Sequence, residues 1–216
     1  MLEKMGEFFD SRLSDYEEHQ LMCIDSALEF YPFTASCLPQ CSGSNILDLG
    51  CGTGLEIDYY FDIVPTAKIT GIDLAPGMLD VLKRKFLNQS LNLILGSYFD
   101  VPFGLNLFDA AVSVESLHHF KKEEKIPLYK KLREALKIGE YFILTDYFAL
   151  NEEEERFYQK ELVRLKQEQN ILDTEFYHYD TPLTIDHEKE ALLTAGFSSV
   201  EVLNNWGSTY TLKATR

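Results

Sequence analysis

The residues best suited to chemistry in this chain lie in a glycine-rich stretch that follows a short apolar run. Asp48 stands near the end of that run, and Gly50, Gly52 and Gly54 then alternate with single residues. An apolar run that breaks into such a loop predicts a buried strand that turns sharply into a helix. Glycine lets the backbone bend there and lets a ligand approach where a Cβ atom would clash. The stretch therefore predicts a cofactor-binding turn.

The spacing of these glycines discriminates between cofactors. A dinucleotide fingerprint runs Gly-x-Gly-x-x-Gly, whereas Leu55 follows the third glycine here and the register is Gly-x-Gly-x-Gly after an acid. Residues 46–54 closely resemble the first motif of the class I S-adenosylmethionine-dependent methyltransferases, and later segments resemble that family in the same order. The resemblance implies S-adenosylmethionine as cofactor and S-adenosylhomocysteine as product. The alternatives are a glycine turn without a ligand and a nicotinamide-dependent oxidoreductase.

Later segments supply further candidates for holding that cofactor. Asp73 ends the next predicted strand, where one carboxylate can accept hydrogen bonds from both ribose hydroxyls, in a methyltransferase or an NAD enzyme alike. The stretch 96–103 resembles the family's adenine-binding segment, with Ser97 replacing the usual Asp and Tyr98 a small residue. Asp48 could instead only cap the turn, and Met78 could belong to the core. The residues predicted to bind the cofactor are Asp48, Gly50, Cys51, Gly52, Gly54, Asp73, Leu74, Met78, Ser97, Tyr98 and Glu115.

Two adjacent histidines are the candidates closest to the expected transfer point. Residues 115–120 resemble the segment of small-molecule methyltransferases in which a strand ends in Leu-His-His, and differ from the Asn/Asp-Pro-Pro-Tyr of enzymes that methylate nucleic-acid bases. Histidine is the usual general base near neutral pH, so His118 is the candidate catalytic residue, with a structural role as the alternative. Arg12 and His19 are also candidates to pair with the cofactor's carboxylate. The acceptor-pocket candidates are Arg12, Tyr16, His19, His119, Tyr147, Tyr177 and Tyr179.

The elements that must position these residues alternate between strands and helices from residue 45 onward. Strands are predicted at 46–49, 69–73, 91–95, 108–114 and 141–146, and helices at 55–61, 76–88, 122–136 and 152–170. Asn151 and Thr184 are predicted helix caps, Gly196 ends a helix, and strands at 199–204 and 209–213 form an antiparallel hairpin. The expected fold is α/β and Rossmann-like: a doubly wound, mostly parallel seven-stranded sheet with a C-terminal antiparallel hairpin and an N-terminal helical lid.

The whole chain, 1–216, is expected to form a single methyltransferase domain. Its predicted parts are a helical lid (1–40), a cofactor-binding core (45–147), a helix and aromatic loop insertion (150–183, the loop running from Asp173 to Pro182) and a closing helix and hairpin (184–216). In the lid, Phe9, Leu13 and Tyr16 have the spacing of one amphipathic helix face.

Composition limits the partners of the protein. The chain has 35 acidic and 20 basic residues and a net charge of −15, so it lacks the basic excess that binding to a nucleic-acid backbone requires. No apolar run approaches the roughly 18 residues of a membrane span, and the first residues lack a signal-peptide pattern, so a cytoplasmic protein is expected. The four cysteines lack paired metal-ligand spacing, and no metal is expected. The expected partner is a small-molecule acceptor; a cofactor-binding protein without turnover is the alternative, and the oligomeric state stays open.

Overall fold

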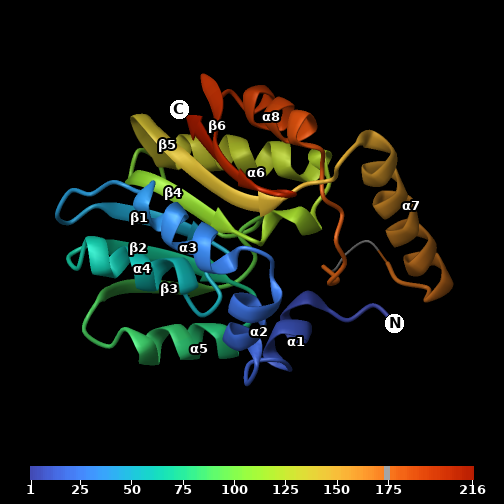
Figure 1. The fold of residues 1–216 in the computed structure, drawn as a ribbon, viewed down its shortest axis with the longest axis horizontal. Coiled ribbons are helices and arrows are strands. Elements are labelled where there is room, and N and C mark those ends of the chain that lie inside the picture. Colours follow the sequence, from blue (N-terminus) through green and yellow to red (C-terminus); the bar gives the residue numbers. More distant parts are fainter. Residues whose placement is uncertain (173–175) are drawn as a thin grey trace.

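One mixed sheet forms the centre of the molecule. The computed structural model describes residues 1–172 and 176–216, so the predicted aromatic loop is described only from Phe176 onward and its residues 173–175 lie outside the described part. The strands are β1 (Asn45–Leu49), β2 (Lys68–Asp73), β3 (Ser90–Leu95), β4 (Phe108–Val114), β5 (Leu136–Tyr147), β6 (Ser199–Trp206) and β7 (Thr209–Thr215). Their order is β3-β2-β1-β4-β5-β7-β6 (Figure 1). Only β7 pairs antiparallel with its neighbours β5 and β6, which confirms the predicted sheet and hairpin.

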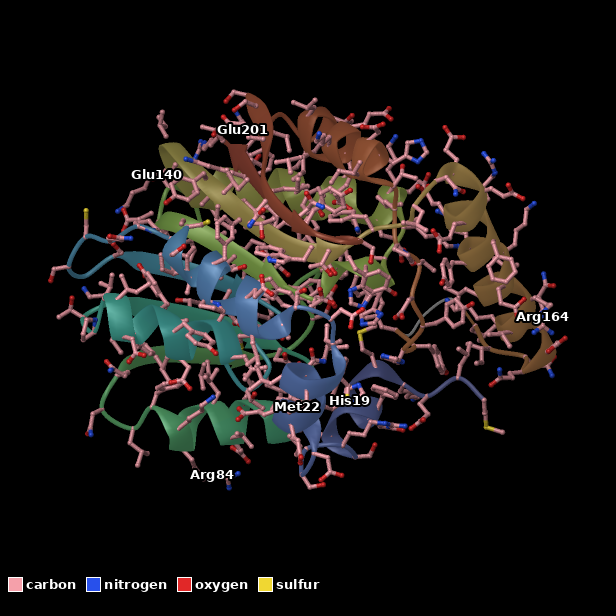
Figure 2. All side chains as sticks on the ribbon, in the orientation of Figure 1. His19, Met22, Arg84, Glu140, Arg164 and Glu201 are labelled. Atoms are coloured by element: carbon pink, nitrogen blue, oxygen red, sulfur yellow. The ribbon has the colours of Figure 1, made fainter. Side chains whose placement is uncertain are left out.

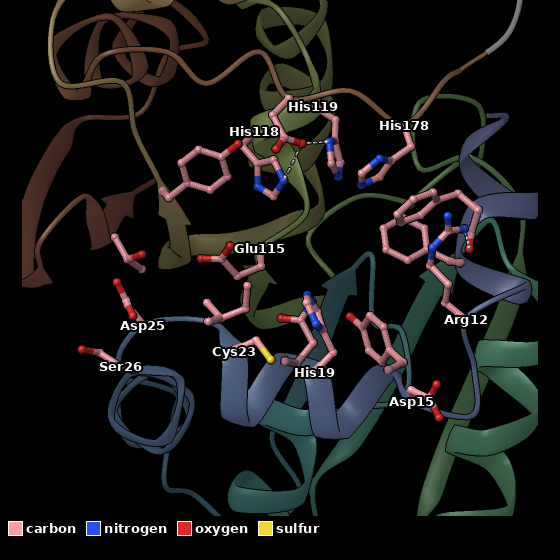
Figure 3. Close-up of a pocket in the computed structure, with 18 of the residues that line it drawn as sticks. Arg12, Asp15, His19, Cys23, Asp25, Ser26, Glu115, His118, His119 and His178 are labelled. Carbon is pink, nitrogen blue, oxygen red and sulfur yellow. Dashed lines mark hydrogen bonds and ion pairs between the residues drawn. The ribbon is translucent and has the colours of Figure 1, made fainter. Parts of the chain in front are cut away.

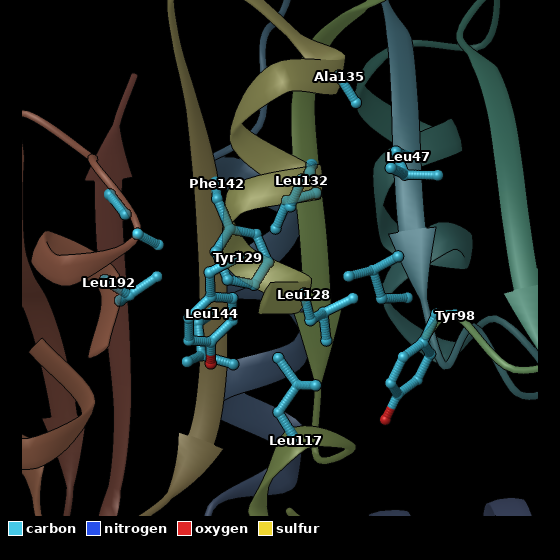
Figure 4. Close-up of a cluster of buried hydrophobic side chains, with 14 of the residues drawn as sticks. Leu47, Tyr98, Leu117, Leu128, Tyr129, Leu132, Ala135, Phe142, Leu144 and Leu192 are labelled. Carbon is cyan, nitrogen blue, oxygen red and sulfur yellow. The ribbon is translucent and has the colours of Figure 1, made fainter. Parts of the chain in front are cut away.

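Helices cover both faces of this sheet, as predicted. They are α1 (Met5–Asp10), α2 (Tyr16–Cys23), α3 (Ala27–Ser36), α4 (Leu55–Ile63), α5 (Pro76–Lys85), α6 (Lys122–Ala135), α7 (Glu152–Glu168) and α8 (Ile185–Thr194), with a 3-10 turn η1 (Leu117–His119). On one face, α6 packs against β5 and α8 against β6, and Leu47, Leu132 and Leu192 belong to one buried cluster (Figure 4). On the other face, α3, α4 and α5 bury Phe30, Tyr60 and other apolar side chains. The strands are hydrophobic because both of their faces are covered.

The predicted caps at the later helices are confirmed. The Asn151 side chain accepts a hydrogen bond from the Glu154 amide at 3.0 Å, and Thr184 Oγ1 accepts one from the His187 amide at 3.3 Å. Helix α7 stands away from the sheet, with Arg164 on its outer surface (Figures 1 and 2). None of the helices within residues 1–172 and 176–216 is both long and apolar enough to cross a membrane.

The predicted single helix face in the lid is wrong. Helix α1 ends at Asp10 and α2 begins at Tyr16, so Phe9, Leu13 and Tyr16 do not share one helix. The Asp10 carboxylate instead accepts a hydrogen bond from the Gly77 amide at 2.9 Å, at the start of α5. This long-range contact stabilises the break between the two helices, whereas the sequence spacing reflects only local periodicity.

Several predicted boundaries shift by one or two residues, and two shift by more. Helix α5 ends at Lys85 and not at residue 88, and β5 begins at Leu136, a residue predicted to end the preceding helix. Leu136 pairs with Phe108 of β4 across an irregularity in the ladder, so tertiary pairing extends the strand beyond its regular alternating part. The division of the chain into lid, core, insertion and closing segments stays a prediction.

Candidate functional site

The ends of β1, β2, β4 and β5 meet at one edge of the sheet, where the strand order reverses between β1 and β4. In open α/β sheets this switch point is where ligands bind. The turn after β1 passes close to its neighbours there: the Gly50 amide donates to the Ile72 carbonyl at 2.9 Å, and a Cβ at Gly50 would lie 2.1 Å from Ser116 Oγ. Gly50 also has a φ of +76°, which glycine adopts without strain. Both constraints require glycine at this position.

A small cavity of about 50 Å³ lies beside this turn. Seven of the predicted cofactor residues line it: Gly50, Gly52, Asp73, Leu74, Met78, Tyr98 and Glu115. Asp73 accepts hydrogen bonds from the Gly52 and Ala75 amides, each at 2.8 Å. Because a carboxylate oxygen has two lone pairs, each Asp73 oxygen retains a position for one further donor. The carboxylate therefore fixes the glycine turn and can still accept ligand hydroxyls.

The lid helices occupy much of this crevice. Met5, Phe9 and Tyr16 line it, and Tyr16 Oη lies 3.6 Å from the point where a Cβ would stand on Gly52. Burial raises the pKa of the Tyr16 hydroxyl far above its usual value, so this ring is a neutral packing group. Small-molecule pockets generally begin near 300 Å³, several times the free volume here. A nucleoside-sized ligand would therefore need more room than Met5, Phe9 and Tyr16 leave beside the turn.

The other four predicted cofactor residues lie outside the lining of the small cavity. Gly54 begins α4 against Leu82, Cys51 is buried against Gly71, and Ser97 Oγ accepts a hydrogen bond from the Phe99 amide at 3.1 Å. Asp48 is fully buried beneath the turn, next to Glu56 of α4. Asp48, Cys51 and Gly54 thus belong to the glycine turn or lie beneath it, whereas Ser97 caps the loop after β3.

The buried acid pair Asp48 and Glu56 makes stability depend on pH. Burial raises the pKa of both carboxyl groups, that of Asp48 most strongly, and neither Asp48 oxygen has a donor partner unless one proton is shared with Glu56. Because folding raises these pKa values, the protonated acids stabilise the folded protein fully at pH values below the unfolded-state pKa of about 4. This contribution is lost as the pH rises through the folded-state pKa.

Asp48→Asn is therefore expected to stabilise the protein at alkaline pH. The asparagine amide still donates a hydrogen bond toward Glu56, and it cannot ionise. The free energy of unfolding should therefore rise by on the order of 1–2 kcal/mol at pH 8. The advantage should shrink toward pH 5, where the wild-type carboxyl retains its proton. Urea unfolding at the two pH values measures this, and a gap that stays constant or widens at pH 5 would contradict it.

A much larger cavity of about 1020 Å³ adjoins the first (Figure 3). Seven of the predicted residues line it: Arg12, Tyr16, His19, Glu115, His118, His119 and Tyr147. Tyr177 and Tyr179 are not among the described residues that line it. The Arg12 guanidinium lies 2.9 Å from the Glu3 carboxylate and 3.7 Å from the centre of the Phe8 ring, so these contacts hold it within the lid.

Two histidine–aspartate contacts form one wall of the large cavity. His118 Nδ1 lies 2.5 Å from Asp146 Oδ1, and His119 Nδ1 lies 3.0 Å from Asp180 Oδ1. Burial alone would lower the pKa of His118, but the carboxylates of Asp146 and Asp180 outweigh it and raise the value to about 9. Burial and the neighbouring His118 charge instead lower the pKa of His119 to about 4. The adjacent rings therefore have opposite charge preferences.

Glu115 connects the two cavities. It follows β4 with a φ of +48°, a left-handed conformation that is strained for a residue with a side chain and that clusters at functional sites. Burial and the Asp146 charge raise the pKa of Glu115 to about 8, and its Oε1 atom is buried without a hydrogen-bond partner. This carboxyl group lines both cavities.

Sequence reasoning missed two acids of this wall, Asp146 and Asp180. Asp146 accepts hydrogen bonds from the Leu117 and His118 amides at 2.8 and 3.0 Å, in addition to its contact with the His118 ring. Its position at the end of a predicted strand, like that of Asp73, was a usable signal. Asp180 lies in the irregular segment after α7, and no pattern in the sequence connects it with residues 118 and 119.

Comparisons with known proteins agree with this geometry. A family model described as "Methyltransferase domain" matches residues 46–139. The biotin biosynthesis bifunctional protein BioHC of Teredinibacter turnerae is 29% identical over 209 residues, covering 91% of this chain and 34% of that protein. Erythromycin 3''-O-methyltransferase of Saccharopolyspora erythraea is 30% identical over 113 residues, covering 50% of this chain and 36% of that protein. The chain thus spans about a third of the length of these relatives.

Solved structures show the same fold. Human N-acetylserotonin methyltransferase, in complex with S-adenosylmethionine, superposes with a TM-score of 0.63 at 18% identity, covering 88% of this chain and 52% of that one. An S-adenosylmethionine-dependent methyltransferase from Mesorhizobium loti gives a TM-score of 0.63 at 19% identity, covering 86% and 96%. The family model covers β2, β3, β4 and the glycine turn after β1. Residues 46–139 match the methyltransferase-domain family, and the fold of the chain is that of solved S-adenosylmethionine-dependent methyltransferases.

Proposed function

We propose that the protein transfers a methyl group from S-adenosylmethionine to a small molecule held in the large cavity. The observation that carries this proposal is the junction of the two cavities. Phe9, Tyr16, Glu115 and His119 line both of them. A cofactor in the crevice beside the glycine turn would therefore border directly on the space for an acceptor.

The residues around the crevice fit the cofactor in chemical type. Asp73 has acceptor positions left for the two ribose hydroxyls, Gly52 offers close approach to its backbone, and the unpartnered Glu115 oxygen suits a ligand's amino group. Binding must also displace Phe9 and Tyr16, which supports the predicted role of residues 1–40 as a lid. Arg12 would have to leave Glu3 before it could pair with a carboxylate.

The proposed reaction needs no covalent bond between the protein and the methyl group. When bound, S-adenosylmethionine supplies a methyl group whose bond to the sulfonium breaks as the acceptor's lone pair attacks the carbon. The side chains of the large cavity then have to align the acceptor and exclude water, an effect of several kcal/mol on the barrier. His118 has its Nδ1 atom occupied by Asp146, so Nε2 is the atom through which this ring would meet an acceptor or its proton.

Several observations favour a small-molecule acceptor. The chain carries a net charge of −15, and one relative is named for O-methylation of erythromycin. Glu56 and Asp58 stand in the first turn of α4, where a dinucleotide enzyme would need to bind a diphosphate, so NAD is disfavoured. A cytoplasmic location stays a prediction.

Ligand binding and turnover test the proposal together. S-adenosylmethionine and S-adenosylhomocysteine should raise the melting temperature, since each would bind only the folded protein, while NAD should not. With methyl-labelled cofactor and a metabolite extract, label should appear in low-mass products. A melting temperature raised by NAD alone would overturn the proposal, and binding without label transfer to any extract would favour a protein that holds the cofactor without turnover.

A further inference from the structure

Three donor atoms converge on the wall of the large cavity. His118 Nε2 lies 3.6 Å and His119 Nδ1 lies 3.0 Å from Asp180 Oδ1, and the donor atoms of the three residues all lie within 4.8 Å of one another. Figure 3 shows both histidines directed into the cavity. Around a tetrahedral ion with bonds of about 2.1 Å, neighbouring ligand atoms stand roughly 3.4 Å apart. The observed separations are close to that arrangement.

We infer that His118, His119 and Asp180 bind a divalent transition-metal ion. Two imidazole nitrogens and one carboxylate oxygen suit ions such as Zn²⁺, Co²⁺, Fe²⁺ or Mn²⁺, whereas Mg²⁺ and Ca²⁺ prefer oxygen ligands alone. This inference departs from the expectation of no metal, which rested on the spacing of the cysteines. The triad joins a turn after β4 to a segment 60 residues later, which sequence spacing does not connect.

Two of the three donor atoms form no hydrogen bond of acceptable geometry, although they lie 3.0 Å from each other. His119 Nδ1 and Asp180 Oδ1 are both buried without a hydrogen bond of acceptable geometry, and the His119 side chain is only 3% exposed. Buried polar atoms are nearly always satisfied, so the poor alignment of this 3.0 Å contact points to a ligand that both atoms would share. An ion bound by both atoms would satisfy them.

The surroundings fix the triad in position. Asp146 holds His118 Nδ1 and directs Nε2 toward Asp180, and metal-bound histidines commonly donate their other N–H to a carboxylate in this way. The Thr181 amide donates to the His118 carbonyl at 2.8 Å and ties the segment that carries Asp180 to η1. Backbone amides in turn hold Asp146. The three side chains are thus in position before an ion arrives, and the ion would displace the proton on His118 Nε2.

The charge of the site also favours a cation. The carboxylates of Asp146 and Asp180 lie 2.5 and 3.6 Å from the two ring nitrogens of His118. Three protein ligands leave at least one coordination position open, as in catalytic metal sites, and this position would face the large cavity. In a role that rests on the proposed function, the ion would bind an oxygen of the acceptor and ease loss of its proton to water before methylation. The ion site itself does not depend on that role.

Titration of chelator-treated protein with Co²⁺ and with Zn²⁺, without S-adenosylmethionine, tests the site. Calorimetry should give one ion per chain, and Co²⁺ should produce visible absorption bands typical of nitrogen and oxygen ligands. His119→Ala, Asp180→Ala and the isosteric Asp180→Asn should each weaken binding at least tenfold. His187→Ala is the matched control and should bind as the wild type does, because it removes a histidine 2.8 Å from the Glu155 carboxylate outside this cavity.

Melting curves establish which variants are folded, and only folded variants are compared. Absence of binding to the wild type, or equal affinity in folded His119→Ala and Asp180→Asn, would overturn the inference. Because these titrations contain neither cofactor nor acceptor, their outcome is independent of whether methyl transfer is found. Ion binding without methyl transfer would support the site and contradict the proposed function. Methyl transfer without ion binding would support the proposed function and overturn the site.

Discussion

Glu188→Ala is expected to lower the free energy of unfolding by about 3–5 kcal/mol, because it leaves a buried ammonium group without its counter-charge. Lys125 of α6 and Glu188 of α8 are 2% and 0% exposed, and Lys125 Nζ lies 2.5 Å from Glu188 Oε2. The Tyr129 hydroxyl also donates a hydrogen bond to the Glu188 carboxylate. The three side chains join the two helices that cover one face of the sheet, so the loss should appear in global unfolding by urea.

An exposed ion pair between the same helices provides the control. Lys122 Nζ lies 2.5 Å from Glu190 Oε2, but the Glu190 side chain is 61% exposed. Glu190→Ala should leave stability almost unchanged, since water screens that pair. Replacing both buried partners, as Lys125→Met with Glu188→Leu, should recover most of the loss because no charge remains buried. Equal effects of Glu188→Ala and Glu190→Ala would contradict this account.

Asp73→Ala is expected to reduce affinity for S-adenosylhomocysteine by ten- to a hundredfold. Hydrogen bonds to a charged group contribute about 1.5–3 kcal/mol, and each 1.4 kcal/mol changes affinity tenfold. The substitution would remove the proposed acceptor of the ribose hydroxyls and also the carboxylate that holds the Gly52 amide. Calorimetric titration of the folded variant measures the loss.

Asp109→Ala is the matched control for this effect. Asp109 also accepts a backbone N–H, from Asn45 at 2.8 Å, but it lies at the opposite end of the strands and pairs with Lys137 at 2.5 Å. Its removal should affect stability and leave ligand affinity intact. A folded Asp73→Ala protein that binds S-adenosylhomocysteine as tightly as the wild type would remove the ribose assignment.

Strands and turns of the core could be predicted because their cause is local. Strands β1, β2 and β4 are apolar because both of their faces are covered. The turn could be recognised because glycine adopts backbone conformations that other residues avoid. The mostly parallel order followed from the alternation of strands and helices. These parts of the fold were therefore confirmed nearly to the residue.

The missed features depend on contacts between distant segments. Lys125 and Glu188 have the composition of surface residues, and only the packing of α6 on α8 buries them. Asp180 meets the histidine pair because the segment after α7 returns to the end of β4. The small free volume at the crevice likewise results from α1 and α2 folding onto it, which periodicity in the first forty residues does not specify.

Phe9 and Tyr16 border both cavities, so the same two side chains limit the space in each of them. Moving these rings to admit one molecule changes the room left for the other. Thermodynamic linkage then makes the influence mutual: whatever factor one ligand imposes on the affinity of its neighbour, the neighbour imposes in return. The first two helices would thus govern the order in which the reactants bind and the products are released.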